Sequence, residues 1–476
     1  MKFETVIGLE VHVELSTATK IFCGCTTKFG GEPNTQVCPV CTGMPGSLPV
    51  FNREVADYAI RAGLALGCSI TPLNKFDRKN YFYPDLPKAY QLSQLYLPIC
   101  RDGGVDIEVG GEQKRVRIRE IHMEEDAGKL IHHPQSQRTF IDYNRGGVPL
   151  IEIVSEPDMR TADEVTAYLE LLRETLLYLG VSDCKMQEGS LRADINLSIR
   201  PVGSREFGTR TEMKNLNSFK AIQRATLYEA RRQIDIIEDG GKVEQETRRW
   251  DDEIGESFAM RSKENAHDYR YFPEPDLLPL EIGPEWIDRV KSTMPETPAL
   301  KRERYTADLG LAPKDAALLT TAKPISDLFE STAKLSGNPK ESANLILGGV
   351  MRLMRETSTT PEELALPAEK LAALVGAVSG GVINRDTGKE VLEQLFRHGK
   401  DPLEYIEENS LAMTQDTSLI LAAVEKAIAE NPNSVLDYRA GKEKALGFLV
   451  GKAMKELRGK GNPHTVNALL REKLSG

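Results

Sequence analysis

The amino-acid sequence changes character near residue 295, and this change limits the chain to a fold of at least two parts. Before this point, segments with strand patterns and helix patterns are mixed. Beyond it, the sequence is rich in Ala, Leu, Glu and Lys at helical spacing, with short breaks at Pro or Gly. A chain of 476 residues is also too long for one ordinary core. We therefore expect an α+β domain over residues 1–294, followed by all-α domains.

Four segments of the first part show clear periodicity. Residues 6–15 and 192–199 alternate apolar and polar side chains with a period of two, which predicts half-buried strands. Residues 162–179 and 219–237 instead place apolar side chains at helical spacing and end close to glycines, which predicts amphipathic helices. The first part is therefore expected to contain a sheet with helices packed on it.

The helical part divides a second time, where residues 399–402 (GKDP) separate two helical groups. We place the domains at 1–294, 295–408 and 409–476. The last domain is basic, because residues 439–476 hold nine Lys or Arg against three Glu, whereas the whole chain has a net charge of −10. A basic tail on an acidic body suits one localised contact with an anionic partner, although a solvated helical surface explains the same composition.

The bulk composition is that of a soluble globular protein, with 40% hydrophobic and 28% charged residues. The first ten residues reach acidic side chains before any long apolar run, so no signal peptide is expected. No stretch approaches the roughly 20 apolar residues of a membrane span. We expect a cytoplasmic protein that makes no membrane contact.

Four of the seven cysteines form a group, Cys23, Cys25, Cys38 and Cys41. Two close pairs of thiolates separated by twelve residues match a tetrahedral zinc site, and C-P-V-C followed by T-G is typical of a zinc knuckle. The alternative is a set of unrelated buried thiols. No water-activating base is near these cysteines in the sequence, so the expected zinc is structural.

Carboxylates recur beside Lys and Arg on the polar faces of the expected strands. The residues concerned are Glu10 with His12, Asp194 with Asn196, Glu125 at the end of the run 115–125, and Glu212 with Lys214. Mg²⁺ takes one or two carboxylates directly and leaves its other positions to water and phosphate, while cations neutralise charge on a transferred phosphoryl group. The pattern indicates a Mg-nucleotide site, unless these charges only face solvent.

Residues 76–91 (FDRKNYFYPDLPKAYQ) combine three tyrosines and two prolines with the cations Arg78, Lys79 and Lys88 in one loop-like stretch. Bases stack on aromatic rings and phosphates pair with cations, so such a stretch suits the acceptor end of an RNA. A packed surface loop rich in Tyr and Pro is the alternative. The sequence contains no G-x-x-x-x-G-K-[ST] phosphate loop, no dinucleotide fingerprint and no serine-rich amidase signature.

The longest motifs, taken in order, resemble one family. Residues 6–15 (VIGLEVHVEL) and 76–90 (FDRKNYFYPDLPKAY) resemble the opening and the most distinctive internal block of the B subunits of the bacterial aspartyl/glutamyl-tRNA amidotransferases. Further blocks are matched by residues 122–129 (HMEEDAGK), 142–147 (DYNRGG), 192–196 (RADIN) and 212–217 (EMKNLN). Residues 442–474 resemble the family's terminal helical module, so the resemblance spans essentially the whole chain.

The resemblance implies a cradle-like mixed-sheet domain, a helical domain and a tRNA-binding tail domain. It also implies a heterotrimer with a glutaminase partner (the A subunit) and a small third partner (the C subunit). In this family ATP phosphorylates the side-chain carboxylate of misacylated Asp-tRNA(Asn) or Glu-tRNA(Gln), and ammonia displaces the phosphate to leave the amide. A carboxylate does not react with an amine until one of its oxygens becomes a good leaving group. Bringing ATP and the carboxylate, both anions, together therefore requires bound cations that neutralise their charges. The missing amidase signature fits ammonia supplied by a partner.

The resemblance also implies roles for particular residues. The magnesium and ATP site is implied at Glu10, His12, Glu125, Asp194 and Glu212, with Asn196 and Lys214 as further nucleotide-binding residues. Catalytic roles are implied for Lys79, Lys88 and Glu125, the two lysines lining the region where ammonia meets the activated carboxylate. The predicted structural zinc is assigned to Cys23, Cys25, Cys38 and Cys41. Some relatives in the family lack these four cysteines, which agrees with a structural role for the metal.

Two other functions stay open from the sequence. One is a kinase-like or ligase-like enzyme of the same fold that acts on a different carboxylate. The other is a non-catalytic tRNA-binding scaffold whose carboxylates no longer bind nucleotide. The intact acidic motifs favour an enzyme, and Mg-dependent ATP binding by the purified chain separates the enzyme from the scaffold.

Overall fold

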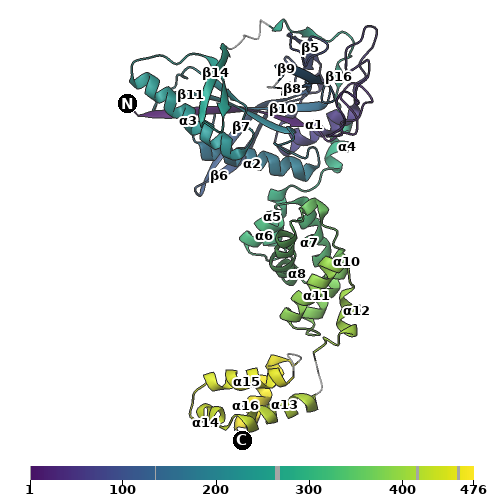
Figure 1. The fold of residues 1–476 in the computed structure, drawn as a ribbon, viewed down its shortest axis with the longest axis vertical. Coiled ribbons are helices and arrows are strands. Elements are labelled where there is room, and N and C mark those ends of the chain that lie inside the picture. The colour runs from purple at the N-terminus through teal and green to yellow at the C-terminus, as the bar shows by residue number, and fades with distance from the viewer. Residues whose placement is uncertain (1, 134–135, 263–268, 414–416, 458–460, 476) are drawn as a thin grey trace. The chain divides into compact units, whose positions relative to one another are not determined.

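The computed structural model describes residues 2–133, 136–262, 269–413, 417–457 and 461–475. The chain divides into two compact units, residues 1–297 and 298–476. The first unit is built on a mixed sheet and the second is helical, so the α+β prediction is confirmed (Figure 1). None of the helices in the described ranges has the length and apolar character that crossing a membrane requires.

Among its described residues, the first unit combines strands with four α-helices. Its strands are β1 (Phe3–Glu14), β2 (Ser69–Ile70), β3 (Leu73–Asn74), β4 (Asp77–Asn80), β5 (Tyr90–Ser93), β6 (Cys100–Val109), β7 (Glu112–Glu125), β8 (Lys129–His133), β9 (Arg138–Asp142), β10 (Pro149–Ser155), β11 (Leu191–Pro201), β12 (Thr211–Lys214), β13 (Glu246–Asp251), β14 (Glu256–Ser262), β15 (Phe272–Pro273) and β16 (Leu280–Glu281). Its helices are α1 (Arg53–Ala65), α2 (Ala162–Leu179), α3 (Phe219–Glu238) and α4 (Pro284–Ser292).

Nine strands form the main sheet, in the order β14-β13-β12-β11-β1-β10-β7-β6-β2. Only β12 and β13 run parallel among these neighbours, so the sheet is mixed. Smaller sheets of the first unit are β15-β4-β5, β16-β3 and β8-β9. The strand β1 therefore lies at the centre of the main sheet.

The alternation predicted for residues 6–15 sets the two faces of β1. Leu9, Val11 and Val13 are buried in the core on one side, and each fully buried aliphatic side chain contributes about 1.5–3 kcal/mol. The helices α1, α2 and α3 pack on this apolar side of the sheet (Figure 1). Glu10 and His12 are on the opposite face and are only partly buried.

The helices that cover the sheet have clear local start and stop signals. The side chain of Thr161 accepts a hydrogen bond from the Glu164 N–H at the start of α2, and the side chain of Ser218 caps α3 by accepting from Ala221 N–H. Gly180 ends α2 in the left-handed conformation, with φ 65°. These caps explain why both helices were predictable from sequence.

The segment 76–91 differs from its prediction, because the structure folds its ends into strands. β4 pairs with β5, and β15, which is distant in sequence, adds a third strand. Arg78 donates to both carboxylate oxygens of Glu274 at 2.7 and 2.8 Å and thereby ties β4 to this later segment. Residues 81–89 between these strands form neither helix nor strand, so the loop prediction holds there, whereas the two strands at its ends were missed. Their third strand, β15, lies almost 200 residues along the chain.

The second unit contains two hydrophobic cores. Helices around the first core are α5 (Pro298–Ala307), α6 (Pro313–Leu319), α7 (Lys323–Ser336), α8 (Pro339–Leu345), η2 (Ile346–Val350), α9 (Met351–Thr357), η3 (Pro361–Glu363), α10 (Ala368–Ser379), α11 (Arg385–His398) and α12 (Pro402–Glu408). The second core is formed by α13 (Thr417–Glu430), α14 (Pro432–Arg439), α15 (Lys444–Glu456) and α16 (Pro463–Ser475). The domain bounds 1–294, 295–408 and 409–476 stay a prediction.

Candidate functional site

The first acidic cluster lies at the centre of the main sheet. Glu10 on β1, Asp194 on β11 and Glu212 on β12 each offer one carboxylate oxygen, and these atoms all lie within 4.8 Å of one another. The strand register brings them together, because Glu10 is opposite Asp194 and Asn196 is opposite Glu212. We call this group, with Asn196 and Lys214, the Glu10 cluster.

Lys214 and Asn196 partly balance and orient the Glu10 cluster. Lys214 Nζ forms an ion pair with Asp194 and lies 3.2 Å from Glu212 Oε1. Burial opposes the charge of Lys214, but the attraction of Asp194 and Glu212 outweighs burial and raises its pKa. Asn196 Nδ2 donates to Glu10 Oε1 at 2.9 Å, while Asn196 Oδ1 is buried without a hydrogen-bond partner. Lys214 is one positive charge among three carboxylates, and the amide oxygen of Asn196 is available as a further metal ligand. Such a group of oxygen ligands with excess negative charge suits a divalent cation.

A second cluster lies beside the first on the same face. His12 Nε2 is 3.6 Å from Glu124 Oε1 and 3.5 Å from Glu152 Oε2. His122 Nε2 lies 2.9 Å from Glu152 Oε2. Since Glu10 and His12 are two residues apart on β1, the two groups are neighbours, roughly 7 Å apart along the strand. We call these four residues the His12 cluster.

The charges of the His12 cluster stabilise one another. Burial by itself would favour the neutral forms of all these groups. The two histidines outweigh burial at Glu152 and hold the pKa of its carboxyl well below the usual range. Glu152 and Glu124 in turn raise the pKa of His122 well above its ordinary value, and they raise that of His12 too. A divalent cation bound by His12, Glu124 and Glu152 would replace the positive charge that the histidines now supply.

Lys79 approaches the His12 cluster from β4. Its Nζ lies 5.5 Å from the ring centroid of Tyr81 and 5.0 Å from that of Tyr269. Burial opposes its charge, but nearby tyrosines and then Glu124 and Glu152 outweigh burial and raise the pKa of Lys79. The structure therefore brings this predicted residue to the polar face of the sheet, as a partly buried cation beside two carboxylates.

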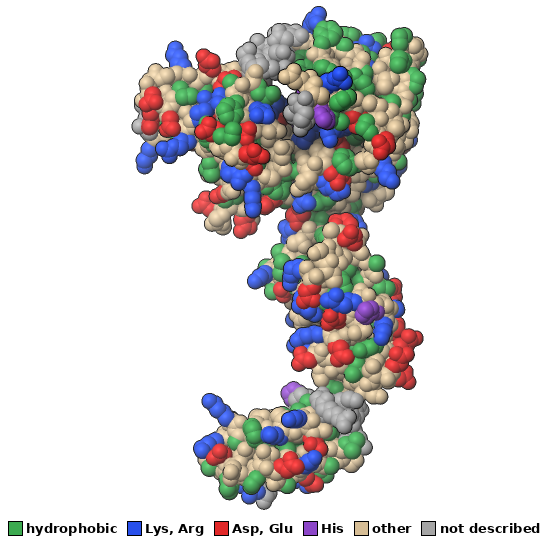
Figure 2. Space-filling model, viewed as in Figure 1, with side chains coloured by type: hydrophobic (Ala, Val, Ile, Leu, Met, Phe, Trp, Pro, Cys, Tyr) green, Lys and Arg blue, Asp and Glu red, His purple; other side chains and the backbone are tan. Residues whose placement is uncertain are grey.

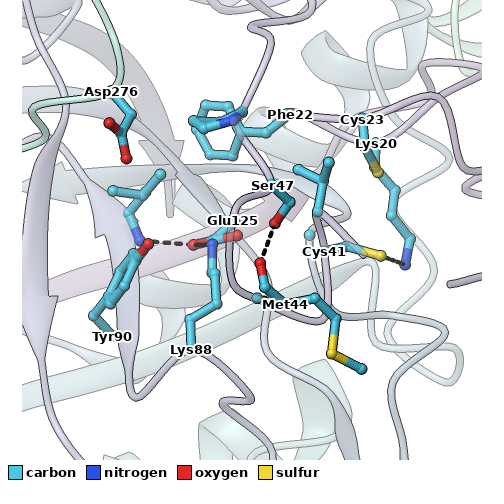
Figure 3. A pocket seen from close by; sticks show the side chains of 15 residues that line it. Lys20, Phe22, Cys23, Cys41, Met44, Ser47, Lys88, Tyr90, Glu125 and Asp276 are labelled. Carbon is cyan, nitrogen blue, oxygen red and sulfur yellow. Dashed lines mark hydrogen bonds and ion pairs between the residues drawn. The ribbon is translucent and has the colours of Figure 1, made fainter. Parts of the chain in front are cut away.

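Glu125, which was expected with Glu10, lies apart from both clusters, and its role stays a prediction. It follows Glu124 on β7, and successive side chains of a strand point to opposite faces. On its own side Glu125 forms an ion pair with Lys88 and accepts a hydrogen bond from Leu92 N–H at 2.9 Å (Figure 3). Of the five residues predicted for magnesium, the structure brings Glu10, Asp194 and Glu212 together, places His12 in the neighbouring cluster, and places Glu125 with Lys88.

The four grouped cysteines have the geometry of a metal site. Their sulfur atoms all lie within 4.8 Å of one another, and Cys38 Sγ is 3.9 Å from Cys41 Sγ. A tetrahedral site with Zn–S bonds of about 2.3 Å spaces its sulfurs roughly 3.8 Å apart, so the donor set fits zinc. The Cys23 thiol donates to Cys41 and lowers the pKa of Cys41 to about 4. Lys20 Nζ, fully buried, lies 3.7 Å from Cys41 Sγ.

Four residues of the site were not predicted individually from the sequence: His122 and Glu124, which lie within the matched block 122–129, and Glu152 and Thr247. Glu152 had a readable signal, because it is the lone carboxylate in the apolar strand PLIEIVS. Thr247 had none: its Oγ1 donates to Glu212 Oε2 at 2.9 Å only because β13 lies parallel to β12 with Thr247 opposite Glu212. Thr247 is 3% exposed, so this hydrogen bond is shielded from water.

Comparison with known proteins gives the family. A family model described as the GatB/GatE catalytic domain matches residues 5–288, and one described as the GatB domain matches residues 327–474. The B subunit of the aspartyl/glutamyl-tRNA(Asn/Gln) amidotransferase of Lachnoclostridium phytofermentans is 60% identical over 473 residues, 99% of both chains. The proteins of the same name from Caldicellulosiruptor bescii and Thermoanaerobacter sp. are 55% and 54% identical, over 99–100% of each chain.

The sheet unit, with its two acidic clusters, is thus a catalytic domain of the GatB/GatE type. The chain belongs to the family formed by the B subunits of the aspartyl/glutamyl-tRNA(Asn/Gln) amidotransferases. The family expected from the motifs is therefore confirmed, and the match covers the sheet unit and most of the helical unit.

The hydrogen bond from Thr247 to Glu212 predicts an effect on cation binding. Thr247→Val removes a donor to a charged group, and we expect Mn²⁺ to bind the Glu10 cluster about tenfold more weakly, equivalent to ~1.4 kcal/mol. Thr247→Ser keeps the hydroxyl and should bind as the wild type does. Electron paramagnetic resonance of free Mn²⁺ measures both variants. Wild-type affinity in Thr247→Val would exclude this role for Thr247.

Proposed function

We propose that this chain, as part of a glutamine-dependent tRNA amidotransferase, activates the side-chain carboxylate of misacylated Asp-tRNA(Asn) or Glu-tRNA(Gln) by ATP-dependent phosphorylation. Ammonia from a glutaminase partner then displaces the phosphate and leaves the amide. The carrying observation is the pair of acidic clusters with partly buried lysines on one face of a catalytic-domain sheet. The names of the relatives support the choice of substrate.

The polar face of the sheet is assigned to Mg-ATP. The Glu10 cluster and the carboxylates of the His12 cluster hold divalent cations, which when bound offset the negative charge of the phosphates. Lys79 and Lys214 add fixed positive charge beside these carboxylates. The face can therefore bring two anions, a phosphate chain and a carboxylate, close together without a phosphate loop.

A cavity of about 230 Å³ next to the Glu10 cluster is assigned to the nucleoside. Its wall includes Glu10 and Asn196, so it opens directly on the carboxylates that face the phosphates. Val154 and Phe207 give it apolar surface for a base, and Arg210 gives it a cation. The wall of this cavity thus offers both polar and apolar surface to a nucleotide.

Lys88 and Glu125 are assigned to the step in which the amine is used. They line a cavity of about 110 Å³ on their side of the sheet, which has room for a few water-sized molecules (Figure 3). Glu125 is a buried carboxylate that can accept a proton from an attacking amine, and Lys88 holds this carboxylate in position. Activation and amination are therefore assigned to different groups of residues.

We also propose the assembly. The relatives are named as one subunit of an amidotransferase, which supports a complex. We infer a cytoplasmic heterotrimer that also holds a glutaminase (the A subunit) and a small third chain (the C subunit).

The tail formed by α13–α16 is assigned to tRNA. Its described face carries interspersed acidic and basic side chains (Figure 2), and Lys442 and Lys473 are ion-paired with Asp437 and Glu425. Arg458 and Lys460 of the basic segment lie outside the described residues. Lysines of the tail that are exposed and not ion-paired in this way are therefore the better candidates for phosphate contacts.

Because activation and amination are assigned to different residues, substitutions should impair the two steps separately. In the reconstituted complex with ammonium as the nitrogen donor, Glu152→Gln should abolish both the acyl phosphate and the amide, because a ligand of the activation site is lost. Glu125→Gln should retain tRNA-dependent ADP release and lose amide formation by roughly 10²-fold. Trapping the acyl phosphate and counting the amide on mischarged tRNA give the two readings.

Asp106→Asn serves as the control for that pair of variants, because Asp106 is an exposed carboxylate of the same sheet, paired with Arg115. It should match the wild type in both readings. Robust amide formation by Glu152→Gln with ammonium would place the activation site elsewhere. Loss of ADP release in Glu125→Gln would return Glu125 to the activation step.

The tail assignment predicts which lysines contribute to tRNA affinity. Removing residues 409–476 should weaken tRNA binding while glutamine hydrolysis by the partner continues. Replacing the exposed Lys452 and Lys455 by Gln should lower the slope of log K against log salt by about 1 per lost contact. The same change at the ion-paired Lys442 and Lys473 should have less effect. Filter binding across salt concentrations measures the slopes, and equal slopes in all variants would refute the tail contact.

A further inference from the structure

The cysteine group and the Lys88–Glu125 pair share one cavity. Cys23 and Cys41 line it from one side, and Lys88 and Glu125 line it from another (Figure 3). The assigned roles of these two groups, structural metal and amine chemistry, give no reason for this closeness. The contact between them runs through Gly43, the residue that ends the C-P-V-C-T-G motif.

The turn that ends at Gly43 is built on the cysteines. The Cys38 carbonyl accepts hydrogen bonds from Thr42 N–H at 3.1 Å and from Thr42 Oγ1 at 2.8 Å. Cys38 N–H points to Cys41 Sγ at 3.2 Å, and Gly43 N–H donates to Val40 O at 3.1 Å. A metal that fixes Cys38 and Cys41 therefore fixes the position of Gly43 as well.

Gly43 lies directly against the backbone of Lys88. A Cβ added to Gly43 would lie 2.5 Å from Lys88 Cγ and 3.3 Å from Lys88 Cα. Neither atom is the free end of the side chain, so Lys88 would have to change its χ1 rotamer or shift its backbone, and either change moves its ammonium. The far end of Lys88 is also held, by the ion pair with Glu125 and by the ring of Tyr90, whose centroid is 5.0 Å from Nζ.

We propose that Gly43 is a positioning residue for Lys88. The metal-bound cysteine turn presents a backbone surface without a side chain, and Lys88 rests on this surface with its ammonium on Glu125. The metal in the cysteine cluster therefore sets the geometry of the amine site as well as stabilising the fold. The catalytic consequence of this inference rests on the function proposed above for Lys88. The contact between Gly43 and Lys88 does not depend on that function.

Two glycines of the same loop allow a matched test. Gly43 and Gly46 both have positive φ, +67° and +83°, so alanine at either position brings the same kind of backbone strain. A Cβ at Gly46 would meet nothing within 4 Å, whereas one at Gly43 would meet Lys88. Gly46→Ala therefore reports the strain alone, and Gly43→Ala reports the strain together with the displacement of Lys88.

The first measurement needs no substrate. In the full-length chain, the rate at which a small amine-reactive reagent acylates Lys88 is followed by mass spectrometry, with zinc content measured in parallel. Gly43→Ala should keep one zinc per chain and acylate Lys88 several-fold faster than both the wild type and Gly46→Ala, because its ammonium leaves Glu125. Equal rates in the two alanine variants would overturn the proposal.

The second measurement uses the assembled complex. A displacement of about 1 Å can cost ~10²-fold in rate, so Gly43→Ala should lose roughly ten- to a hundredfold in kcat/KM for ammonium, with ADP release unchanged. Gly46→Ala should stay near the wild type. A change in acylation without this loss would contradict the role proposed for Lys88 and leave the contact standing.

If Gly43→Ala does not fold, the wild type provides the test. Zinc is removed with a chelator, and hydrogen exchange of residues 86–92 is compared before and after removal. Faster exchange in this segment, restored by adding zinc, is the expected result. Unchanged exchange in a chain that has lost its zinc would show that the cysteine turn does not hold Lys88.

Discussion

Like charges held close together on the central strands are the constraint on which the rest of the structure depends. The Glu10 cluster keeps three carboxylate oxygens within 4.8 Å of one another, and each such pair repels by roughly 3–4 kcal/mol at an effective dielectric constant of about 20. The register of β1, β11 and β12 keeps them there, and the apolar face on the opposite side, packed on α1–α3, stabilises that register. Lys214 relieves only part of the repulsion, which leaves the site suited to bound cations.

The same sheet explains how two chemical steps can be kept apart. Adjacent residues of one strand point to opposite faces, so Glu124 belongs to the His12 cluster while Glu125 belongs to the cavity with Lys88. The phosphates are assigned to the polar face, and ammonia is assigned to reach the activated carboxylate from the side of Lys88 and Glu125, so that the amine meets the acyl phosphate where the phosphate leaves. The two sides of the sheet therefore carry different sets of charged side chains.

Much of this arrangement was readable from local pattern. Alternation predicted β1 and β11 with their polar faces, and paired cysteines predicted the metal cluster, because each depends on residues close in sequence. Pairing over long distances was not readable. The sequence Glu124–Glu125–Asp126 does not show which of its side chains faces which side of the strand, so Glu125 was expected beside Glu10. Thr247 reaches Glu212 only through the parallel pairing of β12 and β13. The strand that adds a third member to the β4–β5 pair at residues 76–91 is β15, far along the chain.

Anomalous diffraction from crystals grown with Mn²⁺ and a non-hydrolysable ATP analogue tests the central claim most directly. We expect manganese peaks at the Glu10 cluster and at His12 with Glu124 and Glu152, with the nucleoside in the cavity beside Asn196 and no peak at Glu125. A zinc-edge peak is expected among the four cysteines. A nucleotide bound away from the polar face of the sheet, with no metal at either acidic cluster, would contradict the assignment.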